Sequence, residues 1–357
     1  MDHPLRRDRL VARLPQLEVD ALLITRLPNV RYLTGFAGSN GQVLMAGDDA
    51  VFFTDGRYTE QSRREVPDLR RETYSTDFPK AFVEACRAVG ASRVGFESGG
   101  VTYRFYQELA AKAEGVELVP VQDEVERLRW VKEADEVRMI EEAQRLTDEA
   151  FDRIVGKLAE GVTEREVALE LEYAMRQAGA EGLAFEPIVA FGESSAEPHH
   201  QPGHRDLRKG DPVKMDFGAL HAGYHADMTR TVAFAPLSTE LRDVYEVVRR
   251  AQQAGIDAVR EGAVGGEVDR AARAIIEQAG PGERFGHSLG HGVGLEIHEG
   301  PNLRTGGEDV LPAGAVVTVE PGVYLPGLGG VRIEDMVEVT ADGCRVLPAT
   351  PKELLIL

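Results

Sequence analysis

Four carboxylates and one imidazole in the second half of this 357-residue chain constrain its fold more than any other feature. Each lies in a short segment marked by glycine or threonine, and the five are Asp216, Asp227, His291, Glu320 and Glu334. Carboxylates and imidazole are hard or borderline ligands, which suit Mn²⁺, Co²⁺ or Zn²⁺ and not a metal that prefers thiolates. A fold that brings the five side chains together would hold two divalent metal ions, and such sites activate water.

Three of these segments are short runs rich in β-branched residues, which predicts strands over 212–217, 315–320 and 331–339. Successive side chains point to opposite faces of a strand, so Phe217 and Ile333 can pack in the core while the acids face a metal. Two cations about 3.5–4 Å apart need carboxylates that bridge them, because a shared anion offsets their repulsion. We therefore expect two of the four acids to bridge.

The spacing of the five segments follows a definite order. Ten residues separate Asp216 from Asp227, thirteen separate Glu320 from Glu334, and Gly-His-Gly around His291 stands between the two pairs. This order resembles the pita-bread metallopeptidases, the family of methionine aminopeptidase, aminopeptidase P, prolidase and the metal-free creatinases. It is most similar to the proline-specific branch, which contains prolidase and aminopeptidase P. Because all five ligand positions are intact, a creatinase-like loss of metal is not expected.

The resemblance extends over the rest of the chain and implies two domains. Segments 29–36 and 53–58 look like the amino-terminal domain of the proline-specific branch, and 128–132 resembles the linker that leads into the catalytic domain. The implied fold class is α/β (α+β). A creatinase-like α/β domain would cover residues 1–127, and a pita-bread catalytic domain with a curved antiparallel sheet and two helix pairs would cover residues 128–357.

The helices of the second domain are visible in the sequence itself. Apolar residues recur at three- and four-residue steps over 133–158, which predicts a long amphipathic helix. Thr163 and Glu166 form a capping box that predicts a second helix ending near residue 177. Two more helical stretches, 239–259 and 268–278, lie between the aspartate and glutamate segments, which suggests an internal two-fold repeat.

The resemblance also implies a role for each metal ligand. Asp227 and Glu334 would bridge the two ions, Asp216 would complete one site, and His291 with Glu320 would complete the other. A hydroxide bridging the metals would be available near neutral pH, because the pKa of water falls from about 15.7 to about 7 on a catalytic zinc ion. Glu320 would carry the proton from that water to the leaving nitrogen.

Other side chains match positions around the substrate. His298, seven positions after His291, resembles the family histidine that donates to the scissile carbonyl oxygen and stabilises the oxyanion. His199 resembles the imidazole of the Pro-His motif that closes over the substrate, while the adjacent His200 is expected to be structural. Three more residues match the walls of the pocket, namely His287, Tyr324 and Arg332.

Arg304 and Lys214 are two basic residues close to the matched positions in the sequence. Prolidases hold the free carboxylate of their dipeptide with an arginine between the positions of His298 and Glu320, and Arg304 is the best match because a guanidinium suits a carboxylate. The alternative is that Arg304 is an ordinary solvated loop residue. Lys214 replaces the aliphatic residue that is usual before the first ligand, so we expect the strand to be more exposed there.

Composition limits the partners. The formal net charge is −19, and nucleic acids or anionic membranes bind basic surfaces, so neither is expected as a partner. There is no signal-like apolar segment near Met1, and the two cysteines, Cys86 and Cys344, cannot form a disulfide framework. We expect a cytoplasmic protein. The resemblance implies a homodimer in which the amino-terminal domain helps to close the partner's active site.

The activity expected first is that of a dinuclear metal-dependent Xaa-Pro dipeptidase, a prolidase that uses the bridging hydroxide to cleave dipeptides ending in proline. The alternative is an Xaa-Pro aminopeptidase, or aminopeptidase P, which acts on longer peptides. A dedicated pocket is needed in either case, because the proline nitrogen carries no hydrogen. A non-catalytic binding protein on the same fold is a third possibility, and its mark would be the loss of a ligand residue.

Overall fold

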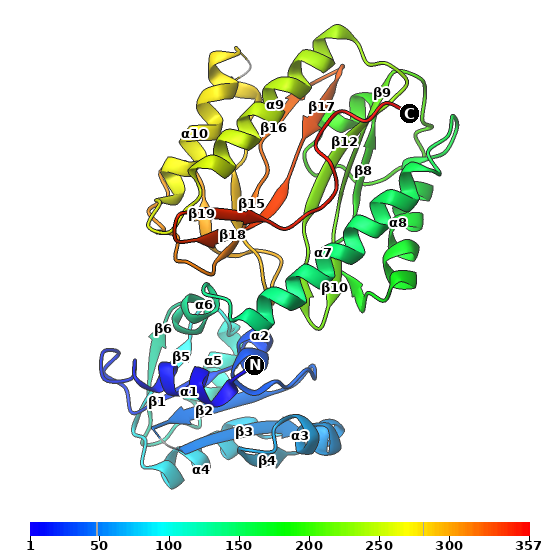
Figure 1. Cartoon of the computed structure of the whole chain (residues 1–357). Coiled ribbons are helices and arrows are strands. Elements are labelled where there is room, and N and C mark those ends of the chain that lie inside the picture. The colour runs from blue at the N-terminus through cyan, green and yellow to red at the C-terminus, as the bar shows by residue number, and fades with distance from the viewer. Residues whose placement is uncertain (48, 281) are drawn as a thin grey trace. The chain divides into compact units, whose positions relative to one another are not determined.

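The computed structural model describes residues 1–47, 49–280 and 282–357. The chain divides into two compact units, Met1–Arg129 and Trp130–Leu357 (Figure 1). This division falls two residues after the predicted boundary at residue 127. No helix in the described part of the chain is both long and apolar enough to cross a membrane.

The first unit is an α/β unit built on one six-stranded sheet. Its strands are β1 (Ala21–Ile24), β2 (Gln42–Ala46), β3 (Asp49–Asp55), β4 (Arg70–Tyr74), β5 (Arg93–Glu97) and β6 (Glu117–Val121). Their order is β4-β3-β2-β1-β5-β6, with antiparallel pairs at the centre and parallel pairs toward both edges. The helices are α1 (His3–Val11), α2 (Leu27–Thr34), α3 (Thr59–Glu65), α4 (Phe78–Val89), α5 (Tyr103–Ala110) and α6 (Glu124–Arg129), with the 3₁₀ turn η1 (Gly56–Tyr58).

Four long helices belong to the second unit. They are α7 (Ala134–Val155), α8 (Glu164–Ala178), α9 (Thr239–Ala258) and α10 (Gly265–Gln278). The predicted capping box before α8 is confirmed, since the Thr163 hydroxyl accepts from the Glu166 N–H at 3.2 Å and the Glu166 carboxylate accepts from the Thr163 N–H at 2.8 Å. These two bonds satisfy backbone N–H groups that have no partner within the first turn of the helix.

The strands of the second unit form antiparallel sheets. They are β7 (Gly182–Leu183), β8 (Ile188–Phe191), β9 (Asp211–Phe217), β10 (Ala219–His221), β11 (Tyr224–His225), β12 (Met228–Phe234), β13 (Gly290–Gly292), β14 (Glu299–Leu303), β15 (Val316–Val319), β16 (Gly322–Leu325), β17 (Gly329–Arg332), β18 (Asp335–Thr340) and β19 (Gly343–Val346). The sheet orders are β11-β10-β7, β12-β9-β8, β14-β13-β15-β18-β19 and β16-β17. Two 3₁₀ turns, η2 (Gly192–Ala196) and η3 (Gly282–Arg284), complete the described elements.

Two hydrophobic cores divide the second unit into halves. In one half, α7 and α8 pack on β8, β9 and β12, with Leu171 and Met215 fully buried between them. In the other half, α9 and α10 pack on β15, β17 and β18, around Val248 and Val317. Figure 1 shows the two helix pairs on either side of the strands. The predicted combination of antiparallel strands with two helix pairs is confirmed.

The prediction of one continuous strand over 331–339 is wrong. β17 ends at Arg332 and pairs with β16, whereas β18 begins at Asp335 and pairs with β15. Glu334 lies at the break, and its N–H donates to the carbonyl of Thr229 at 3.1 Å. The run of β-branched residues carries no sign of this change of partner, because both halves of the run are buried strands.

Candidate metal centre and substrate pocket

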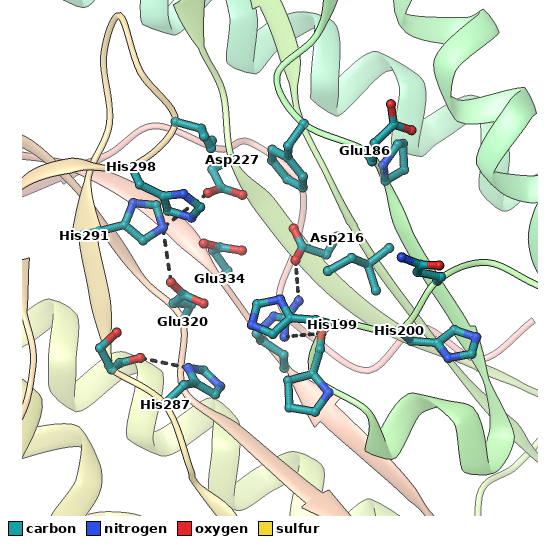
Figure 2. Close-up of a pocket in the computed structure, with 18 of the residues that line it drawn as sticks. Glu186, His199, His200, Asp216, Asp227, His287, His291, His298, Glu320 and Glu334 are labelled. Carbon is teal, nitrogen blue, oxygen red and sulfur yellow. Dashed lines mark hydrogen bonds and ion pairs between the residues drawn. The ribbon is translucent and has the colours of Figure 1, made fainter. Parts of the chain in front are cut away.

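All five predicted metal ligands line one cavity of about 580 Å³. They come from both halves of the second unit: Asp216 from β9, Asp227 from the residue before β12, His291 from β13, Glu320 from the residue after β15, and Glu334 from the break between β17 and β18. Figure 2 shows Asp227, His291, Glu320 and Glu334 pointing toward one another, with Asp216 beside them. Strand ends therefore collect these side chains at one place.

His291 is oriented to present a lone pair to the carboxylates. Its Nε2 lies 3.6 Å from Asp227 Oδ2 and 3.4 Å from Glu320 Oε1. Its Nδ1 lies 3.0 Å from the carbonyl oxygen of Gly292, and because a carbonyl only accepts, Nδ1 must donate. Ligand atoms of Asp227, His291 and Glu334 all lie within 4.8 Å of one another. The group therefore has the geometry and the tautomer that metal coordination requires.

The buried carboxylates of the cluster lie close to one another, which favours the binding of a cation. Burial and the neighbouring carboxylates raise the pKa values of Asp227 and Glu334 well above their usual range. Burial likewise raises the pKa of Glu320 to about 8 and lowers that of His291 to about 4. Asp216 Oδ1 is buried and has no hydrogen-bond partner among the described residues. Crowded buried acids of this kind ionise together when a divalent cation compensates them, so the residues present fit a metal site.

Arg332 and Thr229 connect two of the carboxylates. The guanidinium of Arg332, which is 3% exposed, forms an ion pair with Asp216 through Nη2. Its Nε donates to the Thr229 hydroxyl at 3.0 Å, and that hydroxyl donates to Glu334 Oε2 at 2.7 Å. Its Nη1 donates to the hydroxyl of Tyr324 at 2.9 Å. Bonds of this kind fix the direction in which a carboxylate presents its oxygens to a metal.

Three of the predicted histidines also line the cavity, namely His199, His287 and His298. The ring of His298 lies 4.4 Å from that of His291 in an edge-to-face arrangement. Burial lowers the pKa of His298 and brings that of His287 to about 4, where Arg332 adds to the effect. Both imidazoles are therefore neutral near pH 7, which suits donation of a hydrogen bond to a substrate oxygen.

Sequence comparison places both units in known families. Residues 138–341 match the model of metallopeptidase family M24, and residues 6–131 match the creatinase/prolidase N-terminal domain. The chain belongs to metallopeptidase family M24. Members of this family use divalent metal ions, in agreement with the donor set of the cavity.

One curated relative and two solved structures are similar to this M24 chain over nearly all of their length. An uncharacterized peptidase of Bacillus subtilis, YqhT, is 42% identical over 96% of this chain and 97% of its own. The structure of an Xaa-Pro dipeptidase from Bacillus anthracis has a TM-score of 0.97 at 38% identity, covering 99% of this chain and 100% of the other. An X-Pro aminopeptidase from Thermotoga maritima has a TM-score of 0.90 at 35% identity, with 99% and 100% covered.

Two predicted pocket residues are not among the described residues that line the cavity of this M24 chain. Tyr324 lies behind its wall, where its hydroxyl is 2.9 Å from Nε2 of His287 and accepts from Arg332. Arg304 follows β14 and is exposed. Its proposed contact with a substrate carboxylate stays a prediction.

The expectation of an exposed strand at Lys214 is wrong. The side chain has no exposed surface, and its Nζ donates to the backbone carbonyls of Ser195 at 3.1 Å and Glu197 at 2.5 Å. A buried amine is tolerated when such acceptors surround it. These acceptors belong to a segment some twenty residues earlier, which the strand pattern around Lys214 does not reveal.

The wall farther from the carboxylate cluster was missed in the sequence. Glu186 lines it, and Figure 2 shows Glu186 on the side of the cavity away from Glu320; Gln201 and Asn302 also line the cavity. Glu186 precedes β8, whose register sets Ile188 opposite Asp216. Only this strand pairing reveals that the segment lies at the site, so no local pattern could have found these residues.

Proposed function

We propose that this chain is a metal-dependent Xaa-Pro dipeptidase, which hydrolyses the bond before proline in dipeptides. The observation that carries the proposal is the buried cluster of carboxylates around His291, with an unpartnered oxygen of Asp216. The family membership and the names of the Bacillus anthracis structure and its relatives support the same activity. The five ligands remain intact, which argues against a purely binding role.

We propose that two divalent ions, Mn²⁺, Co²⁺ or Zn²⁺, occupy the cluster. Asp227 and Glu334 would serve both ions, and the closeness of their ligand atoms, which lie within 4.8 Å of each other and of His291, supports this assignment. Asp216 would hold one ion, and Glu320 with His291 the other, which the 3.4 Å separation of Glu320 and His291 supports. Bound divalent ions would supply a water molecule of lowered pKa, about 7 on a catalytic zinc ion.

The protein side chains then have separate tasks around the scissile bond. Glu320, which lines the cavity beside His291, would accept the proton of the attacking water and pass it to the leaving nitrogen. His298, beside His291, donates to the carbonyl oxygen as negative charge develops on it. His199 faces the cluster from the other wall and orients the substrate. Arg332 holds Asp216 in place throughout.

The cavity suits a short peptide that contains proline. Its volume of about 580 Å³ lies within the usual range of about 300–1,000 Å³ for small-molecule sites. Phe185, Pro187 and Ile188 give part of its lining an apolar surface against which a proline ring can pack. For the free carboxylate of a dipeptide, Arg304 remains our proposed anchor, and R304A should raise KM for Ala-Pro with little change in kcat.

A second activity, that of an Xaa-Pro aminopeptidase, is favoured by the chemistry of the far wall. Glu186 offers a carboxylate there, which would repel the free carboxylate of a dipeptide, and the amides of Gln201 and Asn302 also line the cavity. A longer peptide would instead present a neutral amide at that position. The similarity to the Thermotoga maritima aminopeptidase supports this alternative.

The deciding experiment compares hydrolysis of Ala-Pro with that of Ala-Pro-Ala in protein loaded with Mn²⁺. A dipeptidase should cleave Ala-Pro with the higher kcat/KM, and an aminopeptidase should prefer Ala-Pro-Ala. In both cases a chelator should abolish activity and added Mn²⁺, Co²⁺ or Zn²⁺ should restore it. Cleavage of neither peptide by metal-loaded protein would refute the proposed function.

We further propose that the protein is a cytoplasmic homodimer, with residues 1–127 and 128–357 as its domains and with the first domain helping to close the partner's active site. The net charge of −19 supports the absence of nucleic acid and anionic membrane among its partners. A dimer contact is self-complementary about a two-fold axis. Light scattering coupled to size exclusion should give twice the chain mass of 39.0 kDa, and a mass of one chain would contradict the assembly.

A further inference from the structure

His199 reaches the cavity from a segment that contains only one short turn, η2. The side chain is exposed to the cavity, and within the described residues its imidazole makes no hydrogen bond. Figure 2 shows the ring turned toward Asp216 and the adjacent His200 turned away. Two side-chain torsions separate the imidazole from its backbone, so the place of the backbone decides which rotamers can reach the cavity. Whatever holds the backbone before His199 therefore limits where the imidazole can lie.

Lys214 contacts that backbone at three points. Its Nζ donates to the carbonyl of Ser195 at 3.1 Å and to that of Glu197 at 2.5 Å, and it lies 3.4 Å from that of Pro198. The lysine side chain has no exposed surface. All three neighbours are carbonyl oxygens, which only accept, so the lysine nitrogen is the donor in each contact, and they converge on it from residues 195–198.

The contact with Pro198 acts directly on His199. The carbonyl of Pro198 and the N–H of His199 belong to one rigid peptide plane. Arg332 Nη1 donates to the same carbonyl oxygen at 3.2 Å, and its Nη2 pairs with Asp216. Lys214 lies two positions before Asp216 on β9, so both side chains project from the same face of the strand. The carboxylate cluster and the His199 backbone are thus held by neighbouring groups.

Other contacts tether the segment farther from His199. The Ser195 hydroxyl accepts from the Gly330 N–H at 2.7 Å. On the other side, Glu164 Oε2 lies 2.8 Å from Nε2 of His200 and accepts from the Gly203 N–H at 3.0 Å. These bonds hold the ends of the segment. The peptide groups immediately before His199 are held by Lys214 and Arg332.

We propose that Lys214 is a positioning residue that holds the backbone of residues 195–198 so that His199 faces the carboxylate cluster. It touches neither the substrate nor the metal site and acts through His199. This inference rests on the proposed function, because it assumes that His199 acts on the substrate. It also explains why a basic residue occupies a buried strand position next to a metal ligand.

The test is a double-mutant cycle with K214M and H199A, measured on the better of Ala-Pro and Ala-Pro-Ala at full metal occupancy. Small displacements of an active-site group cost up to about 100-fold in rate, so K214M should lower kcat by about 10- to 100-fold with unchanged metal content. In the H199A background the same substitution should change kcat less than about 2-fold, since coupled residues are not additive. Additive effects, or wild-type kcat in K214M, would overturn the proposal.

Lys132 provides a matched control. Its side chain is 1% exposed and its Nζ bonds to Glu299 at 2.8 Å, so K132M also removes a buried lysine but leaves the carbonyls of Ser195, Glu197 and Pro198 untouched. The effects of K132M and H199A on kcat should be additive. Coupling as strong as that of K214M would show that the cycle reports general destabilisation, and would overturn the proposal.

Hydrogen exchange gives a readout that does not depend on activity. Amides of residues 195–203, apart from Pro198 and Pro202, should exchange faster in K214M than in wild type, and K132M should leave them at the wild-type rate. Unchanged exchange in K214M would overturn the proposal even if kcat fell. If the wild type cleaves neither peptide, the proposed function fails, and the exchange measurement still decides whether Lys214 holds this segment.

Discussion

Replacing Thr229 with valine should weaken metal binding while keeping the fold. The Thr229 side chain has no exposed surface, and its hydroxyl donates to Glu334 Oε2 at 2.7 Å and accepts from Arg332 Nε at 3.0 Å. Valine has nearly the same shape but no hydroxyl. T229V therefore frees one carboxylate oxygen of Glu334 and leaves a buried N–H of Arg332 without this partner.

The size of the effect follows from these two bonds. A hydrogen bond to a charged group contributes about 1.5–3 kcal/mol. Each 1.4 kcal/mol corresponds to about a tenfold change in an equilibrium constant. Loss of the bond to Glu334 should thus lower metal affinity by about 10- to 100-fold, which is also the usual cost of removing a partner that orients a metal ligand.

The assay is calorimetric titration of metal-free protein with Mn²⁺, with T147V as the control. Thr147 is equally buried, and its hydroxyl donates to the Ala143 carbonyl at 3.0 Å and accepts from the Ala219 N–H at 3.0 Å. T147V should lower Tm but leave the Mn²⁺ affinity within about twofold of wild type. Wild-type affinity in T229V, or an equal loss in T147V, would refute the role of Thr229.

Three further outcomes are expected. D227N should lose more bound metal than D216N by elemental analysis, since a bridging ligand serves both ions; equal losses would count against bridging. E320Q, reloaded to full metal occupancy, should lose nearly all turnover, because an amide cannot carry a proton; a near-normal rate would assign the proton transfer elsewhere. The pKa of His200 should exceed its ordinary 6.5, since its bonds with Glu197 and Glu164 outweigh the effect of burial, and NMR titration should find it lower in E197Q. The ion pairs of protonated His200 with Glu197 and Glu164 are then fully present below pH 6.5 and are lost as the pH rises through the raised pKa of His200. An unchanged His200 pKa in E197Q would contradict this.

Local patterns predicted the long helices of the second unit. The capping box at Thr163 and Glu166 marked the start of α8, because both bonds form between residues three apart. Periodicity found α7 and α9 within a few residues of their ends. These features depend on neighbours along the chain, which the sequence displays directly.

Features that depend on distant segments were not predictable. The break at Glu334 arises because β17 and β18 pair with different strands, and the burial of Lys214 arises from carbonyls of a segment nearly twenty residues away. The lining of the cavity includes both Glu186 and Asn302, which are over a hundred residues apart in the chain. Neither hydrophobic periodicity nor a short motif reports such pairings.

The two hydrophobic cores of the second unit give the metal ions a mechanical consequence. Asp216 and Asp227 belong to the half that contains α7 and α8, whereas His291 and Glu320 belong to the half that contains α9 and α10. Metal ions bound by ligands from both halves would link two parts of the chain that each have their own hydrophobic core. A ligand at 100 times its dissociation constant adds about 2.7 kcal/mol to the stability of the state that binds it. Loading the site would therefore add to the contacts that already join the two halves, such as the ion pair of Arg332 with Asp216, and would raise the stability of the state in which both halves are folded.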